Sequence, residues 1–249
     1  MKLIIVRHAD PDYEHDFLTE VGLKEASLLV PRMLKLNEDL GGFTDIYCSP
    51  LGRAKATAKP TLDFLGREAI EKEWLREFEG YITRPDTPER QNCCWDWLPE
   101  DWTKVPEHYD INKWNTTETM SPVKKEYDWV CEEFDKVLAE HGYVRADDSE
   151  GCFYHAEKSN HDTLVFFCHF GLEGVLLSHL TNCSPMIYWH NFCAAPSSVT
   201  IVNSEERRKS IASFRIATFG DTSHLFTGKR EPSFAARFCE CYDDDTRHD

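Results

Sequence analysis

The sequence predicts a single α/β domain over residues 1–249, with a mainly parallel central sheet and helices on both faces. Three observations support this fold. Short apolar, β-branched runs alternate with amphipathic helical patterns along the first 180 residues, which is typical of a parallel sheet covered on both sides. Two of these runs each end at a histidine. The 249 residues, 41% of them hydrophobic, suffice for one large domain.

The first half of the chain contains two clear strand–helix units. Residues 3–6 form a buried strand that opens onto Arg7 and His8. Thr19 is a plausible N-cap for a helix to about residue 37, and Pro31 is expected to kink it. The next elements are a strand over 45–48, a turn at 49–53, a helix to about residue 65 and an extended segment over 68–75.

Residues 81–121 break this pattern. The segment is rich in Trp, Pro and Asp, has no sustained period, and holds four of the seven tryptophans, namely Trp95, Trp97, Trp102 and Trp114. A structureless loop of this length is unusual inside a domain. We therefore expect an insertion with short helices of its own, which covers the substrate pocket.

The second half resumes the alternation. Ser121-Pro122 starts a helix that Gly142 closes, and 143–157 forms a hairpin. The expected later elements are a buried strand over 163–168 ending at His169, a helix over 171–181, and antiparallel strands over 198–202 and 211–218. The acidic tail, 239–249, is expected to fray.

Composition excludes several classes of function. With 28 Lys and Arg against 44 Asp and Glu, the formal charge is −16, which disfavours a nucleic-acid partner. No segment has the roughly 20 apolar residues that a membrane span needs, and the apolar run at the N-terminus is too short for a signal peptide, so we expect neither. We expect a cytoplasmic protein with reduced thiols. The Cys93-Cys94 and Cys239/Cys241 pairs lack the spacing of a common zinc site, so no metal and no cofactor is predicted.

Basic residues follow three predicted strands at the point where each strand ends. These are Arg7 and His8, His169, and Arg53 in the turn after the second strand. In an open α/β sheet, ligands bind outside the carboxyl ends of the strands. The sequence therefore predicts an anion site inside an acidic exterior.

A phosphoryl group suits such a site. Arg7 and Arg53 can each hold two oxygens, and a protonated His169 can donate a third contact. Neutral His8 can attack phosphorus, with an acid to protonate the leaving oxygen.

The sequence resembles the histidine phosphatase superfamily, with its phosphoglycerate-mutase-like fold. The resemblance covers residues 3 to about 180, and five motifs in this order are specific. They are Arg7-His8, Leu18-Thr19-x-x-Gly22 with Glu25-Ala26, Ser49-Pro50-Leu51-x-Arg53-Ala54-x-x-Thr57-Ala58, Leu75-Arg76-Glu77, and His169 after an apolar strand.

The resemblance implies a role for each matching residue. His8 is the phosphorylated nucleophile, and Arg7, Arg53 and His169 complete the phosphate pocket. Glu77 matches the proton donor. Glu79 is the alternative acid, because the spacer before the following glycine is shortened here. Glu77 is preferred, since a carboxyl directly after a strand is well placed to act as a general acid.

Three departures from the family pattern bear on the substrate. Ala9 and Phe170 stand where glycine is usual, and Glu14 and His15 replace a common asparagine. The predicted activity is metal-independent hydrolysis of a small phosphorylated substrate, with a phosphoglycerate-type mutase and a non-catalytic phosphate-binding protein as alternatives. The residues identify neither the substrate nor the oligomeric state.

Overall fold

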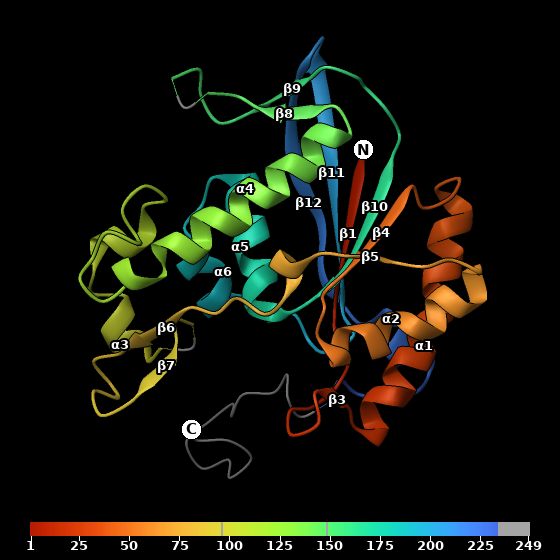
Figure 1. Cartoon of the computed structure of the whole chain (residues 1–249), viewed down its shortest axis with the longest axis horizontal. Helices are drawn as coiled ribbons and strands as arrows, with labels where there is room; N and C mark the ends of the chain where they lie inside the picture. The colour runs from red at the N-terminus through yellow and green to blue at the C-terminus, as the bar shows by residue number, and fades with distance from the viewer. Residues whose placement is uncertain (96, 148, 234–249) are drawn as a thin grey trace.

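The core of the computed structural model is a twisted sheet with helices packed on either side (Figure 1). The structure describes residues 1–95, 97–147 and 149–233. In these ranges the central sheet has eight strands in the order β5-β4-β10-β1-β11-β12-β9-β8. The predicted α/β class, with a central sheet between helices, is confirmed.

The parallel half of the sheet carries the N-terminal strand. β1 (Lys2–Arg7) pairs in parallel with β10 (Thr163–Cys168), and β10 pairs in parallel with β4 (Asp45–Cys48). The short β5 (Ile70–Glu71) forms the edge beside β4. Since parallel neighbours end at one edge of the sheet, the residues that follow these strands lie together.

The other half is antiparallel. β11 (Val199–Arg208) pairs with β1 and with β12 (Ile211–Asp221), which were predicted to be antiparallel neighbours. The predicted hairpin over 143–157 is formed by β8 (Tyr143–Arg145) and β9 (Tyr154–Ala156), which extend this half.

Alternation along β1 assigns side chains to the two faces. Leu3 and Ile5 pack into a core with α4 (Lys124–Glu140), α5 (Phe170–Thr181) and α6 (Pro185–Asn191). Ile4 and Val6 pack into a second core with α1 (Glu20–Asp39) and α2 (Gly52–Leu65). Figure 1 shows these two groups of helices on opposite sides of the sheet. Both faces are buried, as continuous apolar strands require.

Local signals fix several helix ends. The Thr19 side chain accepts a hydrogen bond from the Gly22 N–H, so Thr19 is the N-cap of α1 as predicted. Gly142, at φ 84°, follows the end of α4, where a left-handed residue stops a helix. The predicted start at Ser121 is a 3₁₀ turn, Ser121–Val123, which leads into α4.

The extended segment predicted over 68–75 is wrong in its second half. Only Ile70–Glu71 is a strand, and Glu73–Leu75 is a 3₁₀ helix. Trp74 and Leu75 are both buried, and because they are sequence neighbours a turn of helix is needed to bury both against the same core. Two short helices, α6 and α7 (Ser223–Thr227), were not predicted.

The tryptophan-rich segment has short elements of its own. They are a hairpin of β6 (Tyr81–Thr83) and β7 (Gln91–Cys93), the helix α3 (Pro99–Trp102) and a 3₁₀ helix at Pro106–Tyr109. Trp114 is fully buried against Trp189 of α6, and the His190 ring accepts a hydrogen bond from the Trp97 N–H. The segment is therefore anchored to the α4–α6 side of the sheet (Figure 1).

A small hairpin of β2 (Pro11–Asp12) and β3 (Phe17–Leu18) follows β1. Residues 234–249, and with them the predicted fraying tail and the Cys239/Cys241 pair, lie outside the described residues. Within the described ranges no helix is long and apolar enough to cross a membrane.

Candidate active site

The ends of two parallel strands, β1 and β10, bring the two predicted histidines together. Arg7 is in register with Cys168, so His8 and His169 both leave the sheet at the same level. Their rings lie 5.1 Å apart between centroids. Both rings are almost fully buried, with exposed fractions of 2% for His8 and 0% for His169. The convergence expected at this edge of the sheet is present.

The environment of His8 sets its tautomer and charge. Its Nδ1 lies 2.8 Å from the carbonyl oxygen of Ala9. A carbonyl only accepts, so Nδ1 carries the hydrogen and Nε2 keeps a lone pair. Burial first, and the charge of Arg7 next, lower the pKa of His8 well below its ordinary value. His8 is therefore a neutral imidazole with Nε2 as the nucleophilic atom.

His169 is held by the strand-end serine of β4. The Ser49 hydroxyl lies 2.8 Å from His169 Nε2 and accepts the Leu51 N–H, so it can donate its own hydrogen to the ring. Nδ1 of His169 is buried without a protein partner among the described residues. Burial, followed by the neighbouring His8, lowers the pKa of His169, so the protonated form considered in the sequence analysis is disfavoured.

Each of the two arginines has one terminal nitrogen in a hydrogen bond or ion pair and a buried Nε without a partner among the described residues. Arg7 donates from one terminal nitrogen to the Ala194 carbonyl at 2.6 Å, and its guanidinium lies 5.4 Å from the Phe170 ring centroid. Arg53 pairs with Asp16 at 2.6 Å. The Nε atoms of both arginines are buried without partners in the described structure. Such unsatisfied donors are costly, and an oxyanion would satisfy them.

Sequence reasoning missed Asp16. Its two carboxylate oxygens accept from the Arg53 side chain and from the Gly52 N–H, each at 2.6 Å. Asp16 has φ 46°, and a Cβ on Gly52 would lie 2.1 Å from the Asp16 carbonyl oxygen. Only glycine allows this approach. No local pattern predicts a pair 37 residues apart in sequence. Glu14 and His15, by contrast, are exposed.

The motif residues of α1 and α2 fix the loop after His8. Thr57 accepts the Ala9 N–H, and Glu25 accepts the Asp10 N–H, both at 2.9 Å. A Cβ on Gly22 would lie 2.2 Å from the Asp10 carbonyl oxygen, which explains a glycine inside the first turn of α1. These contacts fix the backbone that follows His8, and Gly22, Glu25 and Thr57 do not line the pocket described below.

The two candidate acids differ in environment. Oε1 of Glu77 accepts N–H groups from Phe78 at 2.8 Å and from Leu172, in the first turn of α5, at 3.0 Å. Burial raises the pKa of Glu77, against these hydrogen bonds and the charge of Arg7. Glu79 is exposed, with its carboxylate 3.4 Å from the Arg76 guanidinium. Raising the pKa favours the protonated form that a general acid needs.

Part of this cluster opens into one pocket of about 310 Å³, whose lining includes neither His8 nor His169. Arg7, Arg53, Glu77 and Glu79 all line it. Aromatic side chains make up most of the remaining wall, and they are Tyr13, Phe78, Tyr81, Trp95 and Phe170. Tyr81 and Trp95 belong to the tryptophan-rich segment, so this segment contributes to the pocket wall.

Behind the site lies a second carboxyl that the sequence analysis did not identify. Glu173 in α5 is 1% exposed. Burial raises its pKa to about 7, although the nearby Thr200 hydroxyl and Arg7 act in the opposite direction. The contact with Thr200 falls short of hydrogen-bond geometry, and both carboxylate oxygens lack partners among the described residues. Glu173 does not line the pocket.

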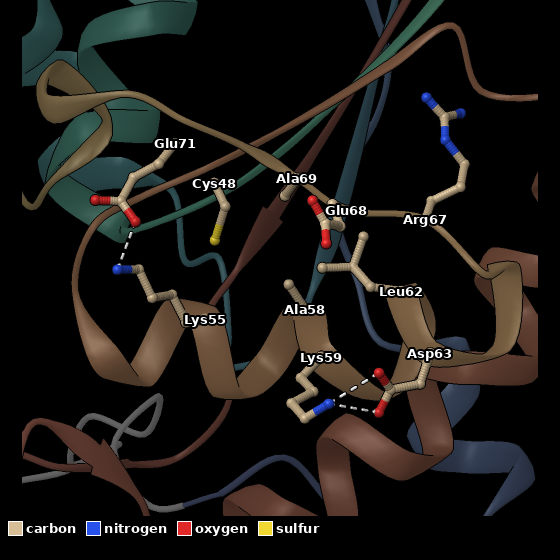
Figure 2. A pocket seen from close by; sticks show the side chains of 10 residues that line it. All are labelled: Cys48, Lys55, Ala58, Lys59, Leu62, Asp63, Arg67, Glu68, Ala69 and Glu71. Atoms are coloured by element: carbon tan, nitrogen blue, oxygen red, sulfur yellow. Dashed lines mark hydrogen bonds and ion pairs between the residues drawn. The ribbon is translucent and has the colours of Figure 1, made fainter.

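A larger pocket, of about 420 Å³, lies between α2 and residues 67–71 (Figure 2). Three cations line it, but each is engaged: Lys55 with Glu71, Lys59 with Asp63, and Arg67 with the backbone carbonyls of residues 43 and 44. It shares no lining residue with the first pocket. Its three basic side chains are matched by three acidic ones, Asp63, Glu68 and Glu71. Among the described residues, no group of three or more His, Cys, Asp or Glu could hold a metal ion.

The fold and the site together define an α/β protein with two buried histidines and two arginines at the carboxyl ends of its parallel strands. The family model described as histidine phosphatase superfamily (branch 1) matches residues 3–217. The chain therefore belongs to the histidine phosphatase superfamily. The sequence has no significant match among curated proteins.

Solved structures share the fold at low sequence identity. A phosphoserine phosphatase from Entamoeba histolytica, in complex with 3-phosphoglyceric acid, is 19% identical with a TM-score of 0.54, covering 90% of this chain and 98% of that chain. A mycobacterial glucosyl-3-phosphoglycerate phosphatase, in complex with inorganic phosphate, is 18% identical with a TM-score of 0.54 and the same coverage, 90% and 98%.

Proposed function

We propose that this protein is a phosphatase that hydrolyses phosphomonoesters without a metal ion, through a phosphohistidine on His8. The observation that carries the proposal is the fixed tautomer of His8. Its Nδ1 donates to the Ala9 carbonyl, so Nε2 presents a lone pair beside two arginines that each have an unused buried donor. Family membership supports phosphatase activity.

In the first step, Nε2 of His8 attacks phosphorus and forms a P–N bond as the P–O bond to the leaving group breaks. Glu77 transfers its proton to the leaving oxygen. In the second step, water attacks the phosphohistidine, and Glu77, now a carboxylate, accepts a proton from that water. The P–N bond breaks, inorganic phosphate leaves, and both side chains return to their starting states.

Charge stabilisation comes from groups that are already oriented. Arg7 and Arg53 are fixed at one end by Ala194 and Asp16, so their remaining N–H groups need little reorganisation to hold the phosphoryl oxygens. A proton on Nδ1 of His169 has no competing protein acceptor in the described structure. We assign it to a third oxygen, so that His169 acts as a donor in its neutral form.

We propose Glu77 rather than Glu79 as the acid. Glu77 is bound to the N-terminal turn of α5, close to His169, and its raised pKa keeps a larger fraction protonated. Glu79 is exposed, and its carboxylate is engaged by the Arg76 guanidinium instead of by α5. We also propose that residues 81–121 act as the substrate cap, because Tyr81 and Trp95 line the pocket.

The experiment is a phosphate-release screen over small phosphorylated metabolites, with no added metal, comparing wild type with His8→Ala. We expect release for at least one ester in wild type and none in His8→Ala, with circular dichroism showing that both are folded. A phosphoglycerate that is isomerised instead of hydrolysed would identify a mutase. Binding of phosphate or vanadate without turnover of any ester would identify a non-catalytic phosphate-binding protein.

A further inference from the structure

We propose that the pocket selects phosphomonoesters whose leaving group carries an uncharged aromatic ring close to the phosphate. This inference rests on the proposed function and specifies its substrate class. It depends on two features of the pocket wall: the aromatic rings above the phosphate site, and the sign of the charges around them.

The wall carries two aromatic side chains that are mostly exposed. Tyr13 and Tyr81 are 68% and 60% exposed, although both line the pocket. Phe170 and Trp95 are partly buried in the same wall. Exposed aromatic groups that gather around a concave site indicate a ligand that covers them. A ring from the substrate would bury this surface and stack against it.

Several of these rings are held in place before any ligand binds. Phe170 lies under the guanidinium of Arg7, and Tyr13 lies under that of Arg53, each 5.4 Å from ring centroid to guanidinium carbon. Trp95 packs against Trp189 at 6.1 Å between centroids. The rings therefore begin directly beside the phosphate-holding groups. Fixed rings lose little conformational entropy when a ligand stacks on them.

The charges at the wall disfavour an acidic leaving group. Among the described residues that line the pocket, the two with positive charge are Arg7 and Arg53, and the proposed mechanism uses both for the phosphoryl group. The other ionisable groups of the wall are the carboxyls of Glu77, which the proposed mechanism requires to be protonated, and Glu79. A carboxylate next to the ester would meet Glu79, and the described lining residues offer it no cation beyond Arg7 and Arg53. Arg76, which pairs with Glu79, does not line the pocket. The wall thus differs from one built for phosphoserine or a phosphoglycerate, both of which carry a carboxylate.

Gly171 also fits a fixed aromatic wall. A Cβ at this position would lie 2.7 Å from the Trp95 ring and 2.8 Å from Oε1 of Glu77. The glycine lets the Trp95 ring and the Glu77 carboxyl pack against the same turn of α5. The aromatic wall and the proposed acid are therefore adjacent, so a ring in the wall places its ester oxygen near Glu77.

The test uses phosphonates, which bind without being hydrolysed. Binding of benzylphosphonate, cyclohexylmethylphosphonate and 4-carboxybenzylphosphonate is measured by titration calorimetry. We expect benzylphosphonate to bind about fivefold more tightly than its cyclohexyl analogue, the range that a stacked pair provides. We expect the carboxylated ligand to bind more weakly than benzylphosphonate.

Variants at Tyr81 assign the preference to the wall. Tyr13 is avoided because it contacts Arg53. Tyr81→Ala should bring the benzyl-to-cyclohexyl affinity ratio close to one, and Tyr81→Phe should keep it. Phe64→Ala is the matched control, because Phe64 is 72% exposed on α2 and does not line the pocket. This control should keep the wild-type ratio.

Equal affinities for the benzyl and cyclohexyl ligands in wild type would overturn the proposed substrate class, as would tighter binding of the carboxylated ligand. Phosphate release from benzyl phosphate is measured alongside. No release, together with selective binding of benzylphosphonate, would overturn the hydrolase mechanism and support the aromatic pocket. Release of phosphate from both benzyl and cyclohexylmethyl phosphates, with equal affinities for the two phosphonates, would support the hydrolase mechanism and overturn the proposed substrate class.

Discussion

Replacement of Glu77 by glutamine isolates proton donation from the structural role of this side chain. Oε1 of Glu77 accepts hydrogen bonds from the Phe78 and Leu172 N–H groups at 2.8 and 3.0 Å. A glutamine can keep both bonds through its own oxygen, whereas alanine would leave two amides without a partner. The variant therefore preserves the wall of the pocket and removes the transferable proton.

The size of the effect depends on the leaving group. General acid catalysis contributes about 10²- to 10⁴-fold, which corresponds to about 3 to 5 kcal/mol of the barrier. An alkyl phosphate needs this proton, so Glu77→Gln should lower kcat/KM by about a factor of 10² or more. p-Nitrophenolate leaves with little protonation, so its kcat/KM should fall by about tenfold or less.

The assay is steady-state kinetics on an alkyl phosphate and on p-nitrophenyl phosphate. The parameter is kcat/KM, because it reports the phosphorylation step and excludes the later hydrolysis, in which Glu77 also acts. Glu79→Gln is the matched control and should change neither substrate strongly. If Glu77→Gln lowers both values equally and slightly, while Glu79→Gln shows the leaving-group dependence, then Glu79 is the acid and the assignment is wrong.

Three further predictions concern the surroundings of the site. Asp16→Asn weakens the ion pair that holds Arg53, so it should raise the inhibition constant of inorganic phosphate about tenfold. Asp12→Asn, in the same hairpin, is the control and should leave this constant unchanged. Equal inhibition constants for the two variants would contradict the role of Asp16. The Glu173 pKa is raised from 4.5 to about 7 in the fold, so its ionisation costs the fold nothing well below pH 4.5. Stability falls as the pH rises from about 4.5 to about 7, and the loss levels off above 7. In urea unfolding, Glu173→Gln should therefore gain about 2.5 kcal/mol relative to wild type between pH 5 and pH 8, and parallel pH curves would refute this. Finally, a chelator should not change the rate of phosphate release, and a loss of activity that added metal restores would refute the metal-free mechanism.

The convergence of the site was predictable because it depends on strand order alone. Each of Arg7, His8 and His169 follows or ends an apolar run, and parallel strands end at one edge of the sheet. Arg53 needed only the turn after β4. These positions follow from apolar patterns that are local in the sequence, so one amino-acid sequence is enough to predict that these residues meet.

Other parts of the site depend on contacts that no local pattern records. Asp16 reaches Arg53 through a left-handed backbone conformation in a short loop. Glu77 was expected directly after a strand, but a 3₁₀ helix precedes it, and its environment is set by α5, nearly 100 residues later. The pocket wall around Tyr81 and Trp95 likewise depends on packing against Trp189 in α6. The Arg53 ion pair, the environment of Glu77 and the aromatic wall therefore all depend on contacts between residues far apart in the sequence, which local secondary-structure propensity does not predict.

Direct detection of the phosphoenzyme is the most immediate test of the mechanism. Wild-type protein is mixed with a ³²P-labelled ester that it hydrolyses, quenched in denaturant within milliseconds, and mapped by peptide mass spectrometry. The account predicts one phosphate, labile in acid and stable in alkali, on the peptide that contains His8, and none in His8→Ala. A phosphate on another residue, or turnover by folded His8→Ala at the wild-type rate, would contradict it.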